Sequence, residues 1–204
     1  MVKTIIFDFG NVFINLDIEG ALLHALKTFN IESLSNEMTA FNNLYEQGLI
    51  STDEFLEFYT ENFPKLSKED LIEVWNFMLK DFPKHRLEFL QNLKKENKYK
   101  LILLSNTNAL HIKWIKENIP FYEDFKNCFN AFYLSHEIHL VKPNNNIFEF
   151  VLNENNLKAK ACLFIDDNKD NINTAESLGF KTWHINPNTE DVVNLFNTKN
   201  HLFD

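Results

Sequence analysis

The sequence of 204 residues has few cysteines, and their arrangement excludes two classes of protein. Cys128 and Cys162 are the only two, and their spacing fits neither a disulfide framework nor a metal-binding motif. We therefore interpret both as small core residues of a protein from a reducing compartment.

Basic residues are also scarce. Lys and Arg together number 20 against 29 Asp and Glu, which gives a formal net charge of −9. Such a surface repels nucleic acids and anionic membranes, so we expect neither as a partner. An anionic substrate has to be held by local positive groups or by a metal ion, against the overall field.

Long hydrophobic runs are absent as well. The apolar run near the N-terminus is too short for the hydrophobic region of a signal peptide, and no small-residue cleavage site follows it. No other run approaches the length of a membrane span. We expect a cytoplasmic protein that does not associate with membranes.

The hydrophobic residues that are present, 45% of the chain, fall into a regular alternation of elements. Continuous apolar runs, typical of buried parallel strands, occupy 4–9, 101–105, 132–135, 162–166 and 181–185. Helical patterns lie between the later runs, at 84–96, 109–118, 144–155 and 168–178. This alternation predicts an α/β fold with a Rossmann-like, doubly wound parallel sheet.

Residues 16–83 differ, because they contain helix signals and no convincing strand. The signals are the apolar pattern at 21–29 and two capping boxes, Ser51 with Glu54 and Ser67 with Asp70. We predict a core domain of residues 1–15 and 84–204 with a small helical domain, 16–83, inserted over the carboxyl ends of the strands, where ligands bind in open α/β sheets. Its aromatic residues at 55, 58, 59 and 63 have helical spacing and are expected to form its own core. Polar residues of the insertion that are candidates to face a substrate are His24, Asn42, Asn43, Tyr45, Glu46 and Gln47.

Polar side chains stand where the predicted strands end. Asp8 ends the first run, Ser105 the second and Asp166–Asp167 the fourth, while Lys142 lies just beyond the third. Taken alone, Asp8 and the acid pair are equally compatible with a turn or a helix cap, the segment 105–108 is more often a loop, and Lys142 before a proline carries little information. Because the carboxyl ends of parallel strands share one edge of the sheet, the joint pattern predicts three carboxylates, a hydroxyl and an ammonium around one crevice.

Four segments carry a family resemblance: FDFGNV (7–12), LLSNTN (103–108), VKP (141–143) and FIDDNKDN (164–171). Their order and spacing resemble the four motifs of the haloacid dehalogenase superfamily, and the helical insertion resembles the C1-type cap of that family. The resemblance implies hydrolysis of a phosphate ester through an aspartyl-phosphate, with Mg²⁺. The D-x-G-N-V form of the first motif is similar to that of the bacterial α-D-glucose-1-phosphate phosphatases, which implies a sugar phosphate such as a hexose 1-phosphate as substrate.

Phosphoryl chemistry assigns a role to each of these residues. Asp8 is the expected nucleophile, and Mg²⁺, a hard ion that prefers oxygen ligands, is expected between Asp8 and Asp167, with Asp166 holding a metal-bound water. Lys142 is expected to bridge Asp8 and a phosphate oxygen. The predicted phosphate donors are the Ser105 hydroxyl, the Asn106 backbone N–H and the backbone amides of Phe9, Gly10 and Asn11.

Gly10 departs from the usual pattern of the superfamily, in which many phosphatases carry a second Asp two residues after the nucleophile. Glycine keeps the backbone carbonyl that, in the family, binds Mg²⁺, but it has no side chain to act as general acid or base. Such assistance is typically worth about 10² to 10⁴ in rate. The sequence leaves three explanations open: a good leaving group such as the anomeric oxygen of a sugar 1-phosphate, a substitute side chain from the insertion or Asn11 holding a water, or slow turnover.

Three alternative functions remain open from the sequence. A halide-releasing hydrolase of the same superfamily also uses an aspartate and a lysine, but does not need the acid pair 166–167 for a metal ion. A phosphoryl-accepting receiver domain has similar residues, but its acid pair comes early in the chain and it has no helical insertion. A phosphate-binding protein with impaired turnover is the third, because of Gly10. We expect a small phosphorylated metabolite as the binding partner. We expect the protein itself to be a monomer or a weak dimer.

Overall fold

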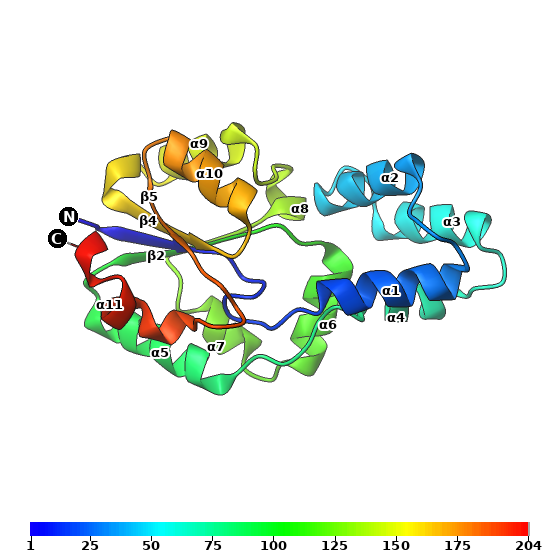
Figure 1. The fold of residues 1–204 in the computed structure, drawn as a ribbon, viewed down its shortest axis with the longest axis horizontal. Coiled ribbons are helices and arrows are strands. Elements are labelled where there is room, and N and C mark those ends of the chain that lie inside the picture. The colour runs from blue at the N-terminus through cyan, green and yellow to red at the C-terminus, as the bar shows by residue number, and fades with distance from the viewer. Residues whose placement is uncertain (204) are drawn as a thin grey trace.

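The computed structural model describes residues 1–203 and contains a five-stranded parallel sheet whose strand order is β3-β2-β1-β4-β5 (Figure 1). In register, Ile5 of the central strand lies between Leu101 and Leu163 of its two neighbours. The strands are β1 (Thr4–Phe7), β2 (Lys100–Ser105), β3 (Ala131–Leu134), β4 (Cys162–Asp166) and β5 (Lys181–His184). Because every pairing is parallel, all strand carboxyl ends lie at one edge, and the strand order reverses at β1.

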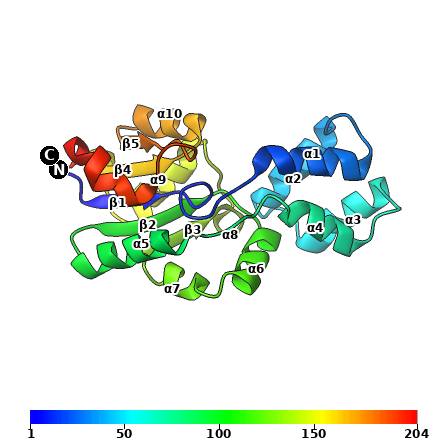
Figure 2. The same ribbon diagram turned by 60° about the horizontal axis from the view of Figure 1, so that its bottom comes forward.

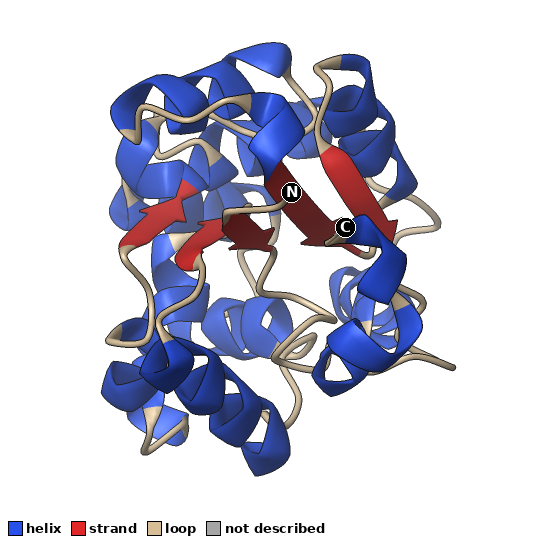
Figure 3. Ribbon diagram, turned by 90° about the vertical axis from the view of Figure 1, so that its left-hand side faces the viewer, coloured by secondary structure: helices blue, strands red, loops and turns tan. Residues whose placement is uncertain are grey.

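Helices cover both faces of the sheet, as Figure 3 shows with the strands in red. Alternate side chains of each strand enter opposite cores: Ile5 and Phe7 pack into one cluster of buried residues, and Ile6 into the other. The first cluster is closed by α5 (Lys84–Glu96), α6 (Ala109–Asn118), α7 (Tyr122–Lys126) and α11 (Leu195–Thr198), and the second by α9 (Asn145–Glu154) and α10 (Lys169–Ser177). The predicted fold class, an α/β doubly wound parallel sheet, is confirmed.

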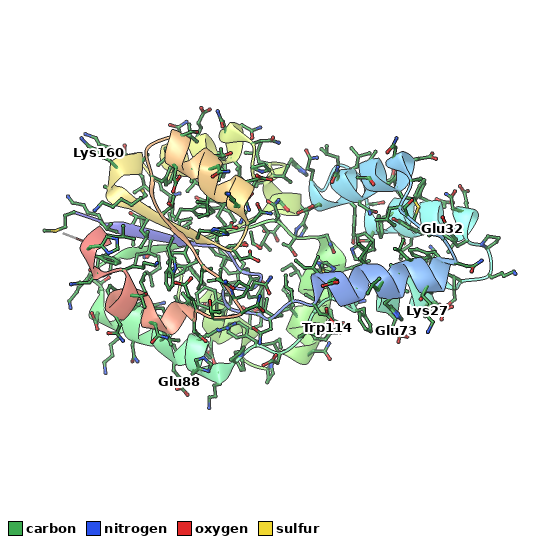
Figure 4. The ribbon with its side chains drawn as sticks, viewed as in Figure 1. Lys27, Glu32, Glu73, Glu88, Trp114 and Lys160 are labelled. Carbon is green, nitrogen blue, oxygen red and sulfur yellow. The ribbon has the colours of Figure 1, made fainter. Side chains whose placement is uncertain are left out.

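The chain between β1 and α5 is helical and extends away from the strand carboxyl ends, on the opposite side of the sheet from the two termini (Figures 1 and 2). It contains α1 (Ile18–Phe29), α2 (Asn36–Glu46), α3 (Thr52–Asn62) and α4 (Lys68–Asn76). Both predicted capping boxes are present, at Ser51 and Ser67. Phe55 and Tyr59 belong to its own buried cluster, as expected, and Phe58 and Phe63 pack against it. The charged side chains of Lys27, Glu32 and Glu73 lie on its outer surface (Figure 4). Its treatment as a separate domain with limits at 16 and 83 stays a prediction.

Two local features differ from the sequence-based expectation. β1 ends at Phe7 rather than at residue 9, because the chain turns through Asn11, whose φ of 54° is left-handed. Helix α2 was not predicted, because its N-terminus lacks a capping box. Three residues after the N-cap Ser35 stands Met38, where a capping box has Glu or Gln. The short α8 (Ser135–Ile138) and the 3₁₀ turns Ala159–Ala161, Val192–Asn194 and Asn200–Leu202 complete the described elements. Within residues 1–203, no helix is both long enough and apolar enough to cross a bilayer.

Candidate active site

The centre of the site is a buried ion-pair chain of three residues. The Lys142 ammonium lies 2.9 Å from Oδ1 of Asp8 and 2.6 Å from Oδ2 of Asp166. Asp8 directly follows β1, Asp166 is the last residue of β4, and Lys142 lies in the loop between α8 and α9. Only 1% of the Lys142 side chain is exposed and none of Asp166. Burial alone lowers the pKa of Lys142, but the two carboxylates outweigh it and raise that pKa. Lys142 is therefore held as a fixed cation beside the predicted nucleophile.

Asp166 is saturated by protein donors. Besides Lys142, its carboxylate accepts hydrogen bonds from the Asn168 backbone N–H at 2.8 Å and from the Asn171 side-chain amide at 3.0 and 3.1 Å. These contacts orient the carboxylate toward Lys142 and toward the N-terminus of α10. These contacts suit Asp166 to anchoring the Lys142 ammonium. The predicted role of Asp166 in holding a metal-bound water stays a prediction.

Asp167, the residue after Asp166, lies close to Asp8. Its Oδ2 accepts a hydrogen bond of 2.8 Å from Nδ2 of Asn11, and the Asn11 Oδ1 accepts one of 3.0 Å from the Leu16 N–H. The left-handed turn at Asn11 makes both contacts possible, because it directs the side chain back across the strand ends. Asn11 therefore orients Asp167, and its amide is engaged rather than free to hold a water.

Ligand oxygens of Asp8, Asp166 and Asp167 all lie within 4.8 Å of one another. Burial raises the pKa of Asp8 to about 7; Lys142 opposes this effect, and Asp166 and Asp167 reinforce it. Three carboxylates and one ammonium leave two negative charges in a largely buried space. That charge, and the all-oxygen donor set, fit a hard divalent cation such as Mg²⁺.

The two predicted phosphate-binding residues after β2 lie beside this cluster. The Asn106 side chain clasps the backbone of Lys142: its Nδ2 donates to the Lys142 carbonyl at 2.9 Å and its Oδ1 accepts from the Lys142 N–H at 3.0 Å. The Ser105 hydroxyl is buried and donates a long, weak hydrogen bond of 3.3 Å to the Asn106 carbonyl. Asn106 thus fixes Lys142, and Ser105 is oriented by little else.

A cavity of about 390 Å³ opens between this edge of the sheet and the helical insertion. Gly10, Ser105 and Asn106 form its floor, and much of its wall is apolar, from α1, α4 and the loop after β1. A Cβ at Gly10 would lie 2.6 Å from Cδ1 of Leu16, so that side chain occupies the space beside the glycine. The polar groups of the wall are Asn42, Glu46, Tyr59, Thr107, Asn108 and His111.

Of the six polar residues named as candidates in the insertion, Asn42 and Glu46 line the cavity. His24 instead stacks on Phe77, and Tyr45 bonds Thr52. Sequence reasoning did not single out His111 or Tyr59 for the wall. His111 joins the two parts of the molecule, with Nδ1 3.2 Å from the Asn108 amide and Nε2 3.1 Å from the Trp75 carbonyl of α4. Only its place in the predicted helix 109–118, directly after the strand-end motif, pointed toward it.

Comparisons with known proteins agree with this geometry. A family model for haloacid dehalogenase-like hydrolases matches residues 2–179. The chain belongs to this family. Membership rules out the receiver-domain alternative.

Similar structures come from two bacteria. A haloacid dehalogenase family enzyme of Bacteroides thetaiotaomicron, solved as a magnesium complex, is 32% identical, with 97% of this chain and 99% of that chain covered and a TM-score of 0.85. The structure of its complex with magnesium and inorganic phosphate is 34% identical, with 96% of this chain and 100% of that chain covered and a TM-score of 0.82. A hydrolase of the family from Porphyromonas gingivalis is 27% identical over 100% and 98% of the two chains, with a TM-score of 0.83. The D-ribitol-5-phosphate phosphatase of B. thetaiotaomicron is 27% identical over 90% of this chain and 91% of its own length.

Proposed function

We propose that this protein is a Mg²⁺-dependent phosphatase that hydrolyses a small phosphorylated metabolite through an aspartyl-phosphate on Asp8. The observation that carries the proposal is the cluster of Asp8, Asp166 and Asp167 with Lys142, whose oxygens and net charge suit a divalent cation. The Bacteroides enzyme in complex with magnesium and phosphate and the D-ribitol-5-phosphate phosphatase support the same reading.

In this proposal Asp8, Asp167 and the backbone carbonyl of Gly10 would hold Mg²⁺, and Asp166 would hold a metal-bound water beside them. When bound, Mg²⁺ screens the repulsion between the phosphate oxygens and the attacking carboxylate. Lys142 balances further charge next to Asp8, at 2.9 Å. The Ser105 hydroxyl, the Asn106 N–H and the amides of Phe9 and Gly10 would donate to the phosphate and orient it for in-line attack, whereas the predicted Asn11 N–H already donates to the Ile14 carbonyl at 2.7 Å.

For the substrate we propose a phosphorylated sugar or sugar alcohol. A cavity of about 390 Å³ suits a molecule of that size, and Asn42, Glu46 and Tyr59 offer hydroxyl-binding groups. The name of the ribitol-phosphate relative supports a phosphate on a primary alcohol. The hexose 1-phosphate suggested by the D-x-G-N-V motif is the alternative within the same class. A panel with Mg²⁺ that compares D-ribitol 5-phosphate, hexose 1-phosphates and hexose 6-phosphates ranks these possibilities.

One variant and one chelator test the activity itself. We expect Asp8→Asn to abolish phosphate release from every member of the panel, and EDTA to abolish it reversibly. Chloride release from a 2-haloacid, undiminished by EDTA, would instead favour the dehalogenase alternative. A wild-type protein that binds phosphate esters without turning them over would favour the impaired binding protein.

A further inference from the structure

Among the described residues of the cavity wall, Glu46 is the one carboxylic acid. It is the last residue of α2, and its side chain shares the cavity with Gly10, Ser105 and Asn106. Burial raises the pKa of Glu46, opposed by the charge of Lys142 and by a hydrogen-bonding interaction with the Asn106 side chain. Glu46 therefore lines the same cavity as residues assigned to the phosphate, at the end of α2 that contacts the core through Ser135.

The end of α2 is fastened to the core, which holds Glu46 in place. The Ser135 Oγ lies 2.7 Å from the Glu46 carbonyl and 2.8 Å from the Thr107 carbonyl, and it accepts a hydrogen bond of 2.9 Å from the Thr107 N–H. At Gly48 a Cβ would lie 2.0 Å from the His136 carbonyl, so the turn after α2 lies directly on α8. These contacts fix the backbone from which the Glu46 side chain extends.

Three positions close to the predicted nucleophile, Asp166, Asn11 and Gly10, are unsuited to proton transfer. Both oxygens of Asp166 are occupied by Lys142, Asn168 and Asn171. The Asn11 amide bonds Asp167 and the Leu16 N–H. Gly10 has no side chain. Transfer of the phosphoryl group of an alkyl phosphate nevertheless releases a basic alkoxide, so departure of this leaving group requires a proton donor.

We propose that Glu46 is the general acid and base of the reaction. In the first step an Asp8 oxygen forms a bond to phosphorus, the bond from phosphorus to the ester oxygen breaks, and the Glu46 carboxyl transfers its proton to that oxygen to release the alcohol. In the second step Glu46, now a carboxylate, takes a proton from water as the water oxygen attacks phosphorus, and the bond to Asp8 breaks. Inorganic phosphate leaves, and both Asp8 and Glu46 return to their starting forms.

This inference rests on the proposed phosphatase function, and it changes one expectation from the sequence. The preference for sugar 1-phosphates followed from the lack of a proton donor at position 10. With Glu46 as donor, esters of primary alcohols become suitable substrates, in keeping with the ribitol-phosphate relative.

The test is Glu46→Gln, compared on an alkyl phosphate from the panel and on 4-nitrophenyl phosphate. The nitrophenolate group leaves without a proton, so only the second step needs Glu46. We expect kcat on the alkyl phosphate to fall about 10² to 10⁴-fold without a burst. On 4-nitrophenyl phosphate we expect a rapid burst of one nitrophenolate per active site, followed by slow turnover, and trapped phosphoryl-enzyme after acid quench.

Glu37→Gln, an exposed acid in the first turn of the same helix, is the matched control and should leave both rates unchanged. A Glu46→Gln enzyme that loses the same factor on both substrates without a burst, or that changes only KM, overturns the assignment and leaves Glu46 as a substrate-binding residue. If the wild-type enzyme hydrolyses neither substrate, or if Asp8→Asn hydrolyses them as fast as the wild type, the phosphatase proposal fails rather than the role of Glu46. Should Glu46→Gln fold poorly, Glu46→Asp supplies the comparison, with partial recovery of the alkyl phosphate rate expected.

Discussion

Asn11 and Asp167, 156 positions apart in the chain, are joined by a hydrogen bond of 2.8 Å from Nδ2 to Oδ2. The first comes from the turn after β1 and the second from the loop after β4. The bond fixes the direction of a carboxylate that we assign to Mg²⁺. The D-x-G-N-V motif thus contributes a positioning residue as well as the nucleophile.

Substituting Asn11 by Ala is expected to weaken Mg²⁺ binding by about 10 to 100-fold, because residues that orient metal ligands typically contribute that much. The apparent activation constant for Mg²⁺ should rise, while kcat at saturating Mg²⁺ changes less. Isothermal titration with Mg²⁺ and activity against Mg²⁺ concentration provide the two measurements. An unchanged activation constant would contradict the role.

Replacing Lys142 by Met leaves Asp8 and Asp166 buried without their shared cation. Breaking a buried ion pair typically costs about 3 to 5 kcal/mol of folding free energy, and we expect a loss of that size in metal-free protein. Activity should also disappear. Because Mg²⁺ offsets the same negative charge, it should raise the Tm of the variant more than that of the wild type. Thermal unfolding with and without Mg²⁺ measures this effect, and Lys160→Met, on the exposed surface, is the control. An equal rise in Tm with Mg²⁺ in Lys142→Met and in the wild type would refute the electrostatic account.

Burial lowers the pKa of His111 from 6.5 to about 4, against a raising effect of its bond to the Trp75 carbonyl. Between pH 6.5 and pH 4 the unfolded chain therefore binds a proton at His111 that the folded protein does not. The free energy of unfolding falls as the pH drops through this range, and this contribution is constant again below it. At 1.36 kcal/mol per pKa unit the loss approaches about 3 kcal/mol. Denaturant unfolding at pH 7 and pH 4.5, in wild type and in His111→Gln, measures it. A variant with the same pH dependence as wild type would point to other groups.

Gly10→Ala tests the packing beside the active-site turn. The added Cβ would lie 2.6 Å from Cδ1 of Leu16, the end of a flexible side chain that can shift, so we expect a cost near the lower end of the about 1 to 3 kcal/mol typical of overpacking. We expect a lower Tm for Gly10→Ala and recovery in the double variant Gly10→Ala with Leu16→Ala, relative to Leu16→Ala alone. Additive effects of the two substitutions in this cycle would show that no clash occurs.

The parts of the fold that the sequence predicted are those governed by local pattern. The apolar runs that became β1, β2 and β4 are buried on both faces, and this is why their signal was unambiguous. Their shared edge then followed from parallel pairing, and the structure does bring Asp8, Lys142, Asp166 and Asp167 together. The capping boxes at Ser51 and Ser67 likewise depend on residues three apart.

Features that depend on long-range contacts were not predictable in the same way. The role of Asn11 requires Asp167, and the engagement of Asp166 requires Asn171 and Asn168 in a particular loop conformation. Helix α2 lacks a capping box, so the sequence did not distinguish Glu46 from its polar neighbours. Its position over the phosphate end depends on Ser135, 89 residues away.

The hydroxyl of Ser135 touches both the final carbonyl of α2 and the backbone of Thr107, two residues after the serine assigned to the phosphate. Movement of α2 away from the core would therefore break a contact that also involves the loop after β2. We expect the position of the insertion and the conformation of that phosphate-binding loop to be coupled through this one hydroxyl.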